Sequence, residues 1–229
     1  MRIMDENTIR SQVLKLAQAC DYEREHSHQV SKLALKIFDG LQGLHQWTGR
    51  ERFFLEAGSL LHDIGWVKGR TRHHKTGRDL ILECSYIPLD EKSKRIVALI
   101  VRYHRRSFPQ PHHKYFSELG RKSQKQVCGL ASFLRVADAL DLRHCSVVKD
   151  VRCDIQRQAV IFELTAKDVT DLERQVTKKK ADLFEKTFQR KLILRLKARS
   201  FGSHPEIDRR RILGQVLSKS HEKKTVSWD

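Results

Sequence analysis

Histidine and aspartate side chains recur along the first two thirds of the chain in positions that suit a metal ion. The sequence holds twelve histidines, and a lone histidine is more often a surface or hydrogen-bonded core residue than a ligand. Helical phase separates the two cases, because a ligand must lie on the inner face of its helix or at the helix end. Six residues meet this condition, in the chain order His26, His62, Asp63, His73, His104 and Asp138.

The apolar residues of each predicted helix mark its inner face, and this shows which candidate ligands point inward. His26 shares a face with the apolar residues of its helix, whereas His28 lies on the opposite side and is predicted to face water. The same spacing puts His73 and His104 on apolar stripes of their own helices. Asp138 falls on the buried face of a further helix, and a buried carboxylate needs a partner. We therefore expect these side chains to converge in one bundle.

The adjacent pair His62 and Asp63 is predicted to end a helix just before Gly65. We interpret Gly65 as the residue that caps this helix. The pair lies on the same side of the helix as Gly58 and Ser59, away from the apolar stripe. Small residues there would let another helix come close, so the sequence predicts that His62 and Asp63 lie between two helices.

Imidazole and carboxylate groups in one place suit a divalent transition metal. Manganese, iron, zinc, cobalt and nickel all accept such ligands, and magnesium is a further alternative. A bound ion would activate water and orient a phosphoryl oxygen, so that no nucleophilic side chain is needed. Lys75, Arg105 and Arg106 adjoin predicted ligands and could bind substrate phosphate, although an ordinary solvated basic surface explains them equally well.

The elements that must position these residues are mainly helices. Apolar stripes at helical spacing predict an HD-type helical bundle over residues 8–146. Two alternating runs that meet near Arg157 and Gln158 predict a β-hairpin, and a helix from about Asp168 to Phe188 and a short strand over 192–196 follow. The expected fold is mainly α, with the bundle at 8–146, a small α+β appendage at 147–200 and a mildly basic tail at 201–229.

The composition narrows the classes of function. The net charge of +17 indicates a polyanionic partner, and residues 65–125 alone hold fifteen Lys and Arg against five Asp and Glu. Five cysteines without a CxxC pair indicate reduced thiols, and no apolar run suits a membrane span or a signal peptide. We therefore expect a cytoplasmic protein that binds no membrane. The sequence has no glycine-rich phosphate loop, which disfavours kinases and dinucleotide-binding enzymes.

The motifs around these residues resemble the HD superfamily of metal-dependent phosphohydrolases, whose pattern is carried by His26, by the pair in LLHDIG and by Asp138 in LRVADALD. More narrowly, five segments are similar to the C-terminal HD region of exopolyphosphatase and guanosine pentaphosphate phosphohydrolase proteins: EHSHQVSKLALKIFDGL, LLHDIGW, RYHRR, FLRVADALD and KKKADLFEKTF. This resemblance covers residues 15–197. Members usually carry an actin-like phosphatase module ahead of this region, which this sequence lacks, so their exopolyphosphatase activity is not carried over.

The resemblance implies two sets of ligands: one ion held by His26, His62, Asp63 and Asp138, and a second held with the help of His73 and His104. Asp63 would bridge the two ions through its two carboxylate oxygens. With a single ion, His73 or His104 could instead protonate the leaving group. The implied reaction is hydrolysis of a phosphate ester or anhydride by metal-activated water, and the implied substrate is a nucleotide, an alarmone or polyphosphate.

Two other functions remain open on the sequence. The chain could be a catalytically silent HD module that binds or senses a phosphorylated ligand or polyphosphate. It could also bind nucleic acid through its basic surface, although its few aromatic residues are not interleaved with the charge as a stacking platform requires. A complete set of ligand types favours the hydrolase over the sensor. A homodimer formed through the appendage is an open alternative.

Overall fold

The structure is a computed structural model that describes residues 5–166 and 171–197, with only the backbone described at 171–173. Helices dominate, so the prediction of a mainly α fold with a small C-terminal α+β appendage is confirmed. The helices of the bundle are α1 Glu6–Ala19, α2 Arg24–Gly40, α3 Gln42–His45, α4 Gly49–Leu60, the 3-10 helix η1 Ile64–Lys68, α5 His73–Glu83, α6 Glu91–Tyr103 and α7 Arg121–Leu140.

The appendage consists of a hairpin, two short helices and a final strand. Its elements are β1 Val148–Ile155, β2 Ala159–Ala166, α8 Asp171–Lys180, α9 Asp182–Phe188 and β3 Lys191–Leu196. The hairpin is antiparallel, with Cys153 opposite Phe162, whereas β3 joins β2 in parallel. Parallel strands need a long crossover connection, and α8 and α9 lie within it.

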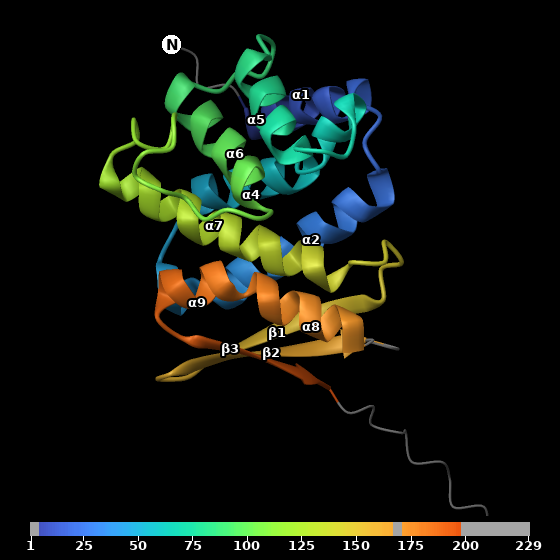
Figure 1. Cartoon of the computed structure of the whole chain (residues 1–229), viewed down its shortest axis with the longest axis vertical. Helices are drawn as coiled ribbons and strands as arrows, with labels where there is room; N and C mark the ends of the chain where they lie inside the picture. Colours follow the sequence, from blue (N-terminus) through green and yellow to red (C-terminus); the bar gives the residue numbers. More distant parts are fainter. Residues whose placement is uncertain (1–4, 167–170, 198–229) are drawn as a thin grey trace, which may run out of the picture. The chain divides into compact units, whose positions relative to one another are not determined.

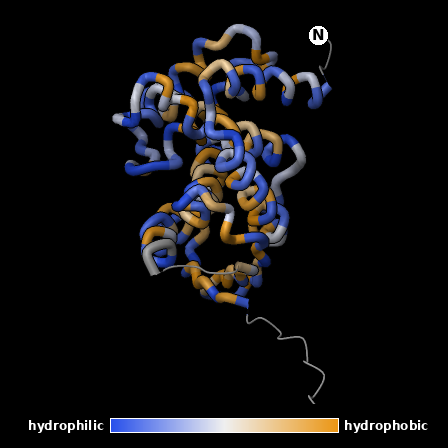
Figure 2. The backbone as a smooth tube through the Cα atoms, turned by 90° about the vertical axis from the view of Figure 1, so that its right-hand side faces the viewer, coloured by the Kyte–Doolittle hydropathy of each residue, from blue (hydrophilic) through white to orange (hydrophobic). Residues whose placement is uncertain are grey.

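Helix α7 is the central element of the described fold. It packs against α2, α4 and α6 of the bundle and against α8 and α9 of the appendage. Figure 1 shows α8 and α9 between α7 and the sheet, with the sheet at one end of the described fold. Figure 2 shows hydrophobic stretches of the tube along the inner sides of the helices. Burial of these stretches removes apolar surface from water, which is the main favourable contribution to folding.

One continuous hydrophobic core joins the bundle to the appendage. Phe133 of α7 and Phe38 of α2 are fully buried in it, and so are Phe162 of β2 and Phe184 of α9. The appendage therefore packs on the bundle through apolar side chains as well as through backbone connections. The division into a bundle domain at 8–146 and an appendage at 147–200 stays a prediction. The predicted tail at 201–229 lies outside the described residues.

Two predicted helices are interrupted in the structure. The spacing of apolar residues over 22–44 predicts one amphipathic helix, but in the structure α2 ends at Gly40 and the single turn α3 follows it. The helix predicted to begin near Asp168 divides at Ala181 into α8 and α9, and its first residues lie outside the described part. Among the helices that the structure describes, none is both long and apolar enough to cross a bilayer.

Candidate metal centre

All six predicted ligands lie at or near the ends of helices. His26 is the third residue of α2, His73 is the first residue of α5, His104 follows the last residue of α6, and Asp138 is in the last turn of α7. His62 and Asp63 lie in the turn between α4 and η1. Several helix ends therefore meet at one place in the bundle.

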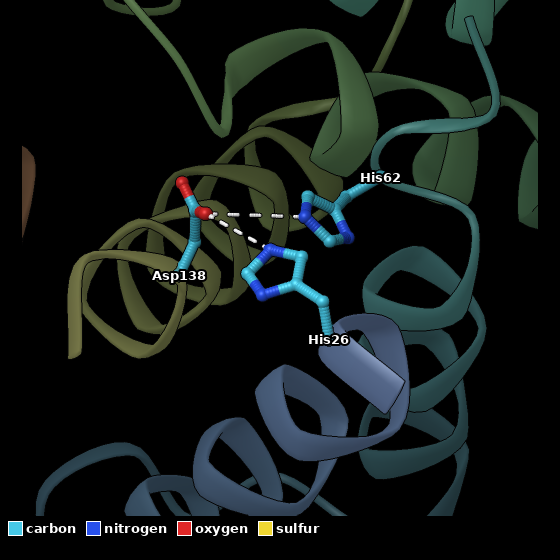
Figure 3. Close-up of side chains that lie close together, drawn as sticks. All are labelled: His26, His62 and Asp138. Carbon is cyan, nitrogen blue, oxygen red and sulfur yellow. Dashed lines mark ion pairs between the residues drawn. The ribbon is translucent and has the colours of Figure 1, made fainter. Parts of the chain in front are cut away.

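Three of these residues form a first ligand group: His26, His62 and Asp138. Their ligand atoms all lie within 4.8 Å of one another. The Nε2 atoms of His26 and His62 are 3.6 and 3.9 Å from Oδ1 of Asp138, and Figure 3 shows both rings turned toward this carboxylate. The group brings together residues that are 36 and 76 positions apart in the sequence.

The other three residues form a second ligand group: Asp63, His73 and His104. Oδ1 of Asp63 is 3.1 Å from Nε2 of His73 and 3.6 Å from Nε2 of His104. The two imidazole nitrogens are themselves 3.3 Å apart. These three atoms also lie within 4.8 Å of one another, and all three residues are buried.

Asp63 connects the two groups. Its Oδ1 faces His73 and His104, while its Oδ2 is 3.4 Å from Nε2 of His62 in the first group. A carboxylate can bind one ion through each oxygen, so this placement agrees with the bridging role predicted for Asp63. Two adjacent metal sites that share Asp63 stay a prediction, and this placement is the geometry that such a pair requires.

Backbone carbonyls orient three of the four histidines. Nδ1 of His62 donates to the carbonyl of Ser59 at 2.8 Å, Nδ1 of His73 to that of Arg70 at 2.9 Å, and Nδ1 of His104 to that of Val101 at 2.7 Å. A carbonyl oxygen only accepts, so the proton of each neutral ring lies on Nδ1. Nε2 then presents its lone pair to the centre, as a metal-binding histidine must.

His26 is oriented by a carboxylate instead. Its Nδ1 lies 2.8 Å from Oδ2 of Asp141, one turn beyond Asp138 on the chain. The ring of His144 stacks on the ring of His26, with centroids 3.6 Å apart. The position of Asp141 in the sequence, one turn beyond Asp138, suits either a residue that orients a ligand or a salt-bridge residue, whereas no local pattern predicts the stacking of His144.

The donor set fits a divalent cation. Nε2 of His26 and Nε2 of His62 are buried and have no hydrogen-bond partner among the described residues. In the second group, two Nε2 lone pairs and one carboxylate oxygen point at one another with no donor between them. A buried polar atom without a hydrogen-bond partner is costly, whether it accepts, as on a neutral ring, or donates, as on a protonated one. A cation bound among them would satisfy these atoms.

The titration of these groups reflects the same crowding of carboxylates and imidazoles. Burial opposes protonation of His26, but the carboxylates of Asp138 and Asp141 outweigh it and raise its pKa to about 9. Burial alone would raise the pKa of Asp138, yet Lys180 and the surrounding histidines hold it well below the usual range. For His104, burial lowers the pKa to about 3. His104 therefore stays neutral in the metal-free protein, so its Nε2 offers a lone pair and no proton to the second group.

The local sequence explains how the turn around the His-Asp pair is built. Helix α4 ends at Leu60, so His62 and Asp63 follow the helix and do not form its last turn as predicted. Gly65 lies inside η1, so its interpretation as a cap is wrong. A Cβ atom at this position would meet the carbonyl oxygen of His73 at 2.0 Å, so only glycine lets this turn approach the start of α5.

Small residues also let a neighbouring helix approach α4, as the sequence predicted. A Cβ atom at Gly58 would lie 2.8 Å from a methyl group of Ile100 on α6. Ser59 is fully buried, and its hydroxyl donates to the carbonyl of Leu55 at 2.7 Å. The close contact brings the end of α6, which carries His104, to the turn that holds His62.

The predicted phosphate-binding residues do not join the ligand groups. Lys75, Arg105 and Arg106 are exposed, and within the described part of the chain none of their side chains has a hydrogen bond or ion pair to the six ligands. His28 is also exposed, as its helical phase predicted. His74 is buried next to His73, but it belongs to neither ligand group.

One charged residue of the centre was missed in the sequence. Lys180, the last residue of α8, places its ammonium group on Oδ2 of Asp138. It follows two other lysines, and composition does not distinguish the three. Helical phase could have done so, because Lys180 shares a face with Thr177 and Phe184, which are both fully buried.

The fold and the paired His/Asp groups together define a helical domain with a candidate centre for divalent ions. The comparison with protein families identifies the particular family. A family model described as Ppx/GppA phosphatase, domain III, matches residues 9–196, and the chain belongs to this family. The match covers both the bundle and the appendage, and it confirms the resemblance recognised in the sequence motifs.

Proposed function

We propose that this chain is a metal-dependent phosphohydrolase of the HD type, which cleaves a phosphate ester or anhydride of a nucleotide, alarmone or polyphosphate. The observation that carries the proposal is the pair of ligand groups that share Asp63. Membership of a phosphatase family supports the reaction class. A module that only binds a phosphorylated compound has no need of two sets of metal-binding residues around one carboxylate.

In this proposal His26, His62 and Asp138 hold one ion, His73 and His104 hold a second, and Asp63 contacts both. Bound divalent ions would supply Lewis acidity, which lowers the pKa of water and neutralises charge on the phosphoryl group. The protein contributes fixed geometry, because the backbone carbonyls of Ser59, Arg70 and Val101 hold the rings before any ion binds. It also excludes bulk water, since the four histidines are buried.

The alternative role of His73 or His104 as a proton donor applies only to a site with one ion. Burial lowers the pKa of His104 to about 3, so this ring carries no proton to donate from Nε2 near neutral pH. The low pKa suits a ligand better than a general acid. For His104 we therefore favour the ligand role.

The substrate must carry a phosphoryl group, and the positive charge of the protein favours such anions. Lys75, Arg105 and Arg106 stay proposed phosphate-binding residues, because their side chains are exposed and close in sequence to His73 and His104. An extended anion such as polyphosphate could contact the exposed cations while its reacting phosphoryl group lies at the centre.

The test is hydrolysis by protein that has been stripped with a chelator and then reloaded with manganese. Short-chain polyphosphate, nucleoside polyphosphates and a generic phosphodiester are offered in parallel, and released phosphate or alcohol is measured. We expect activity only in the reloaded protein. The matched control is His28→Ala, which removes an exposed histidine of the same helix and should behave as the wild type.

A metal-loaded protein that hydrolyses none of these compounds but binds one of them would contradict the hydrolase proposal. It would favour the module that senses a phosphorylated ligand. A protein that takes up no metal, even after incubation with manganese, would reject the metal-dependent mechanism altogether.

A further inference from the structure

The appendage contributes a charged side chain to the metal centre. The ammonium group of Lys180 lies on Oδ2 of Asp138, while Oδ1 of the same carboxylate faces His26 and His62. The two preceding lysines, Lys178 and Lys179, are exposed. Lys180 therefore occupies Oδ2 of Asp138 and leaves Oδ1 for an ion.

The position of Lys180 is built into the fold. Arg135, one turn before Asp138 on α7, donates from Nε to the carbonyl of Lys180 at 3.5 Å and from Nη2 to Asp182 at 2.9 Å. Its Nη1 donates to the carbonyls of Tyr103 and Arg106 at 3.3 and 3.2 Å. A single buried guanidinium thus ties the junction of α8 and α9 to the segment that contains His104.

The most exposed side chains at the centre are those of Lys180 and Asp138. The side chains of the four histidines are at most 2% exposed, whereas that of Asp138 is 15% exposed, the largest value among the six ligands. The side chain of Lys180 is 20% exposed. Among the six ligands, Asp138 therefore offers the largest surface to solvent, and the ammonium group of Lys180 lies directly beside it.

The positive charge of Lys180 suits the binding of an anion. An ammonium group that is bound on one side by a carboxylate still has two further N–H donors. A phosphoryl oxygen is an acceptor that gains from charge-assisted hydrogen bonds with such a group. The side chain of Lys180 is 20% exposed, so these remaining donors can be reached by a ligand from solvent.

We propose that Lys180 is a substrate-binding residue, whose ammonium group holds a phosphoryl oxygen while it keeps Oδ2 of Asp138 away from the ions. This inference rests on the proposed metal-dependent function. It makes the appendage part of the active site, since α8 delivers the residue and α9 completes its support. In this proposal Asp138 binds its ion through Oδ1 alone.

The test compares three variants of the full-length chain. Lys180→Gln keeps a hydrogen bond to Asp138 but removes the charge, Lys180→Arg restores the charge, and Lys179→Gln is the matched control on the exposed side of α8. Titration calorimetry measures the binding of manganese to metal-free protein and of inorganic phosphate to manganese-loaded protein. Neither readout requires turnover.

We expect Lys180→Gln to bind phosphate about tenfold more weakly, as the loss of one charge-assisted hydrogen bond predicts. It should bind manganese as tightly as the wild type or severalfold more tightly, because a positive charge beside the ions is gone. Lys180→Arg should recover phosphate binding, and Lys179→Gln should match the wild type. If Lys180→Gln does not fold, Lys180→Met is measured in its place, with the same expectation for both ligands.

Wild-type affinity for phosphate in the Lys180 variant would overturn the inference, and so would a loss of manganese binding in that variant, which would show that Lys180 only positions Asp138. A wild-type protein that binds no manganese would reject the proposed function, and this inference with it. These outcomes are distinguishable because the wild type and the variant are titrated with manganese before phosphate is added.

Discussion

The two ligand groups share Asp63 but differ in their surroundings. The first group has charged neighbours, since Asp141 contacts His26 and Lys180 contacts Asp138. In the second group, backbone carbonyls hold both histidines, and no carboxylate other than Asp63 belongs to it. Asp138 also gives the first group its contact with solvent, whereas the second group is buried.

This difference suggests that the two ligand groups have different roles in hydrolysis. Asp138 is the most exposed of the six ligands, so we expect substrate to enter at the first group, where an ion would contact the phosphoryl group directly. The second group is buried, and we expect it to act through Asp63. We therefore expect the two groups to hold their ions independently but to contribute unequally to hydrolysis.

Substitution of His62 should have the largest effect on activity. His62→Ala removes the nitrogen that lies between Asp138 and Oδ2 of Asp63, so we expect the first group to lose its ion. The Lewis acidity of such an ion contributes several kcal/mol, which corresponds to a loss of about a thousandfold in kcat. Elemental analysis should find one ion per chain fewer than in the wild type. Full activity in this variant would reject the assignment of the first group.

Substitution of His104 is the matching test of the second group. His104→Ala removes a buried ligand without touching His26, His62 or Asp138. We expect one ion to remain and kcat to fall about a hundredfold, which corresponds to about 3 kcal/mol of the several that a bound ion contributes. A variant that loses both ions would show that the groups are not independent, which would contradict the comparison.

A smaller effect is expected at Asp141, which supports the first group only indirectly. Asp141→Asn weakens the contact with Nδ1 of His26, and loss of such a partner usually lowers metal affinity by about 10-fold to 100-fold. Manganese titration measures the change. Asp39→Asn is the control, because Asp39 pairs with Arg52 at the surface. Equal affinity in both variants would mean that His26 needs no carboxylate to orient it.

The smallest expected effect is the change of manganese affinity with pH, which depends on the protonation of His26. Because the pKa of His26 is raised to about 9, its ring is protonated in the metal-free protein near neutral pH, and an ion must displace that proton. Manganese affinity should therefore rise with pH and level off above about pH 9, and calorimetry in two buffers should detect proton release. A flat affinity between pH 7 and 9 would contradict this.

The stability of the metal-free protein should change in the opposite direction. A raised pKa means that His26 stabilises the folded state fully below its ordinary value of 6.5, and that this contribution is lost as pH rises through about 9. Thermal melts of metal-free protein across this range should follow that trend. The metal-loaded protein should not, because His26 then carries no proton to lose.

Helical phase identified His26 and Asp138 as candidate ligands because these two residues lie on inner faces of regular helices. The burial of His26 and the exposure of His28 follow from two positions on the same helix, and Asp138 follows from the apolar residues one and two turns before it. Such spacing depends on local geometry alone, which a sequence records well. The mainly helical fold and the hairpin were predictable for the same reason.

The contacts that join separate elements were not predictable in this way. The need for glycine at position 65 comes from the carbonyl of His73, which no local pattern records. The stacking of His144 on His26 and the contact of Lys180 with Asp138 depend on how a loop and the appendage pack against α7. The break at Ala181 has a similar origin, since Arg135 binds groups on both sides of it.

The central claim is that two ions share one carboxylate, and the metal content of Asp63→Ala tests it most directly. Wild-type and variant protein are purified without chelator, incubated with manganese, desalted and submitted to elemental analysis, with Asp79→Ala as a control outside the centre. The account predicts about two ions per chain in the wild type and in the control, and a loss of both in Asp63→Ala, because each group depends on one oxygen of Asp63. Retention of two ions in Asp63→Ala, or no ion in the wild type, would contradict it.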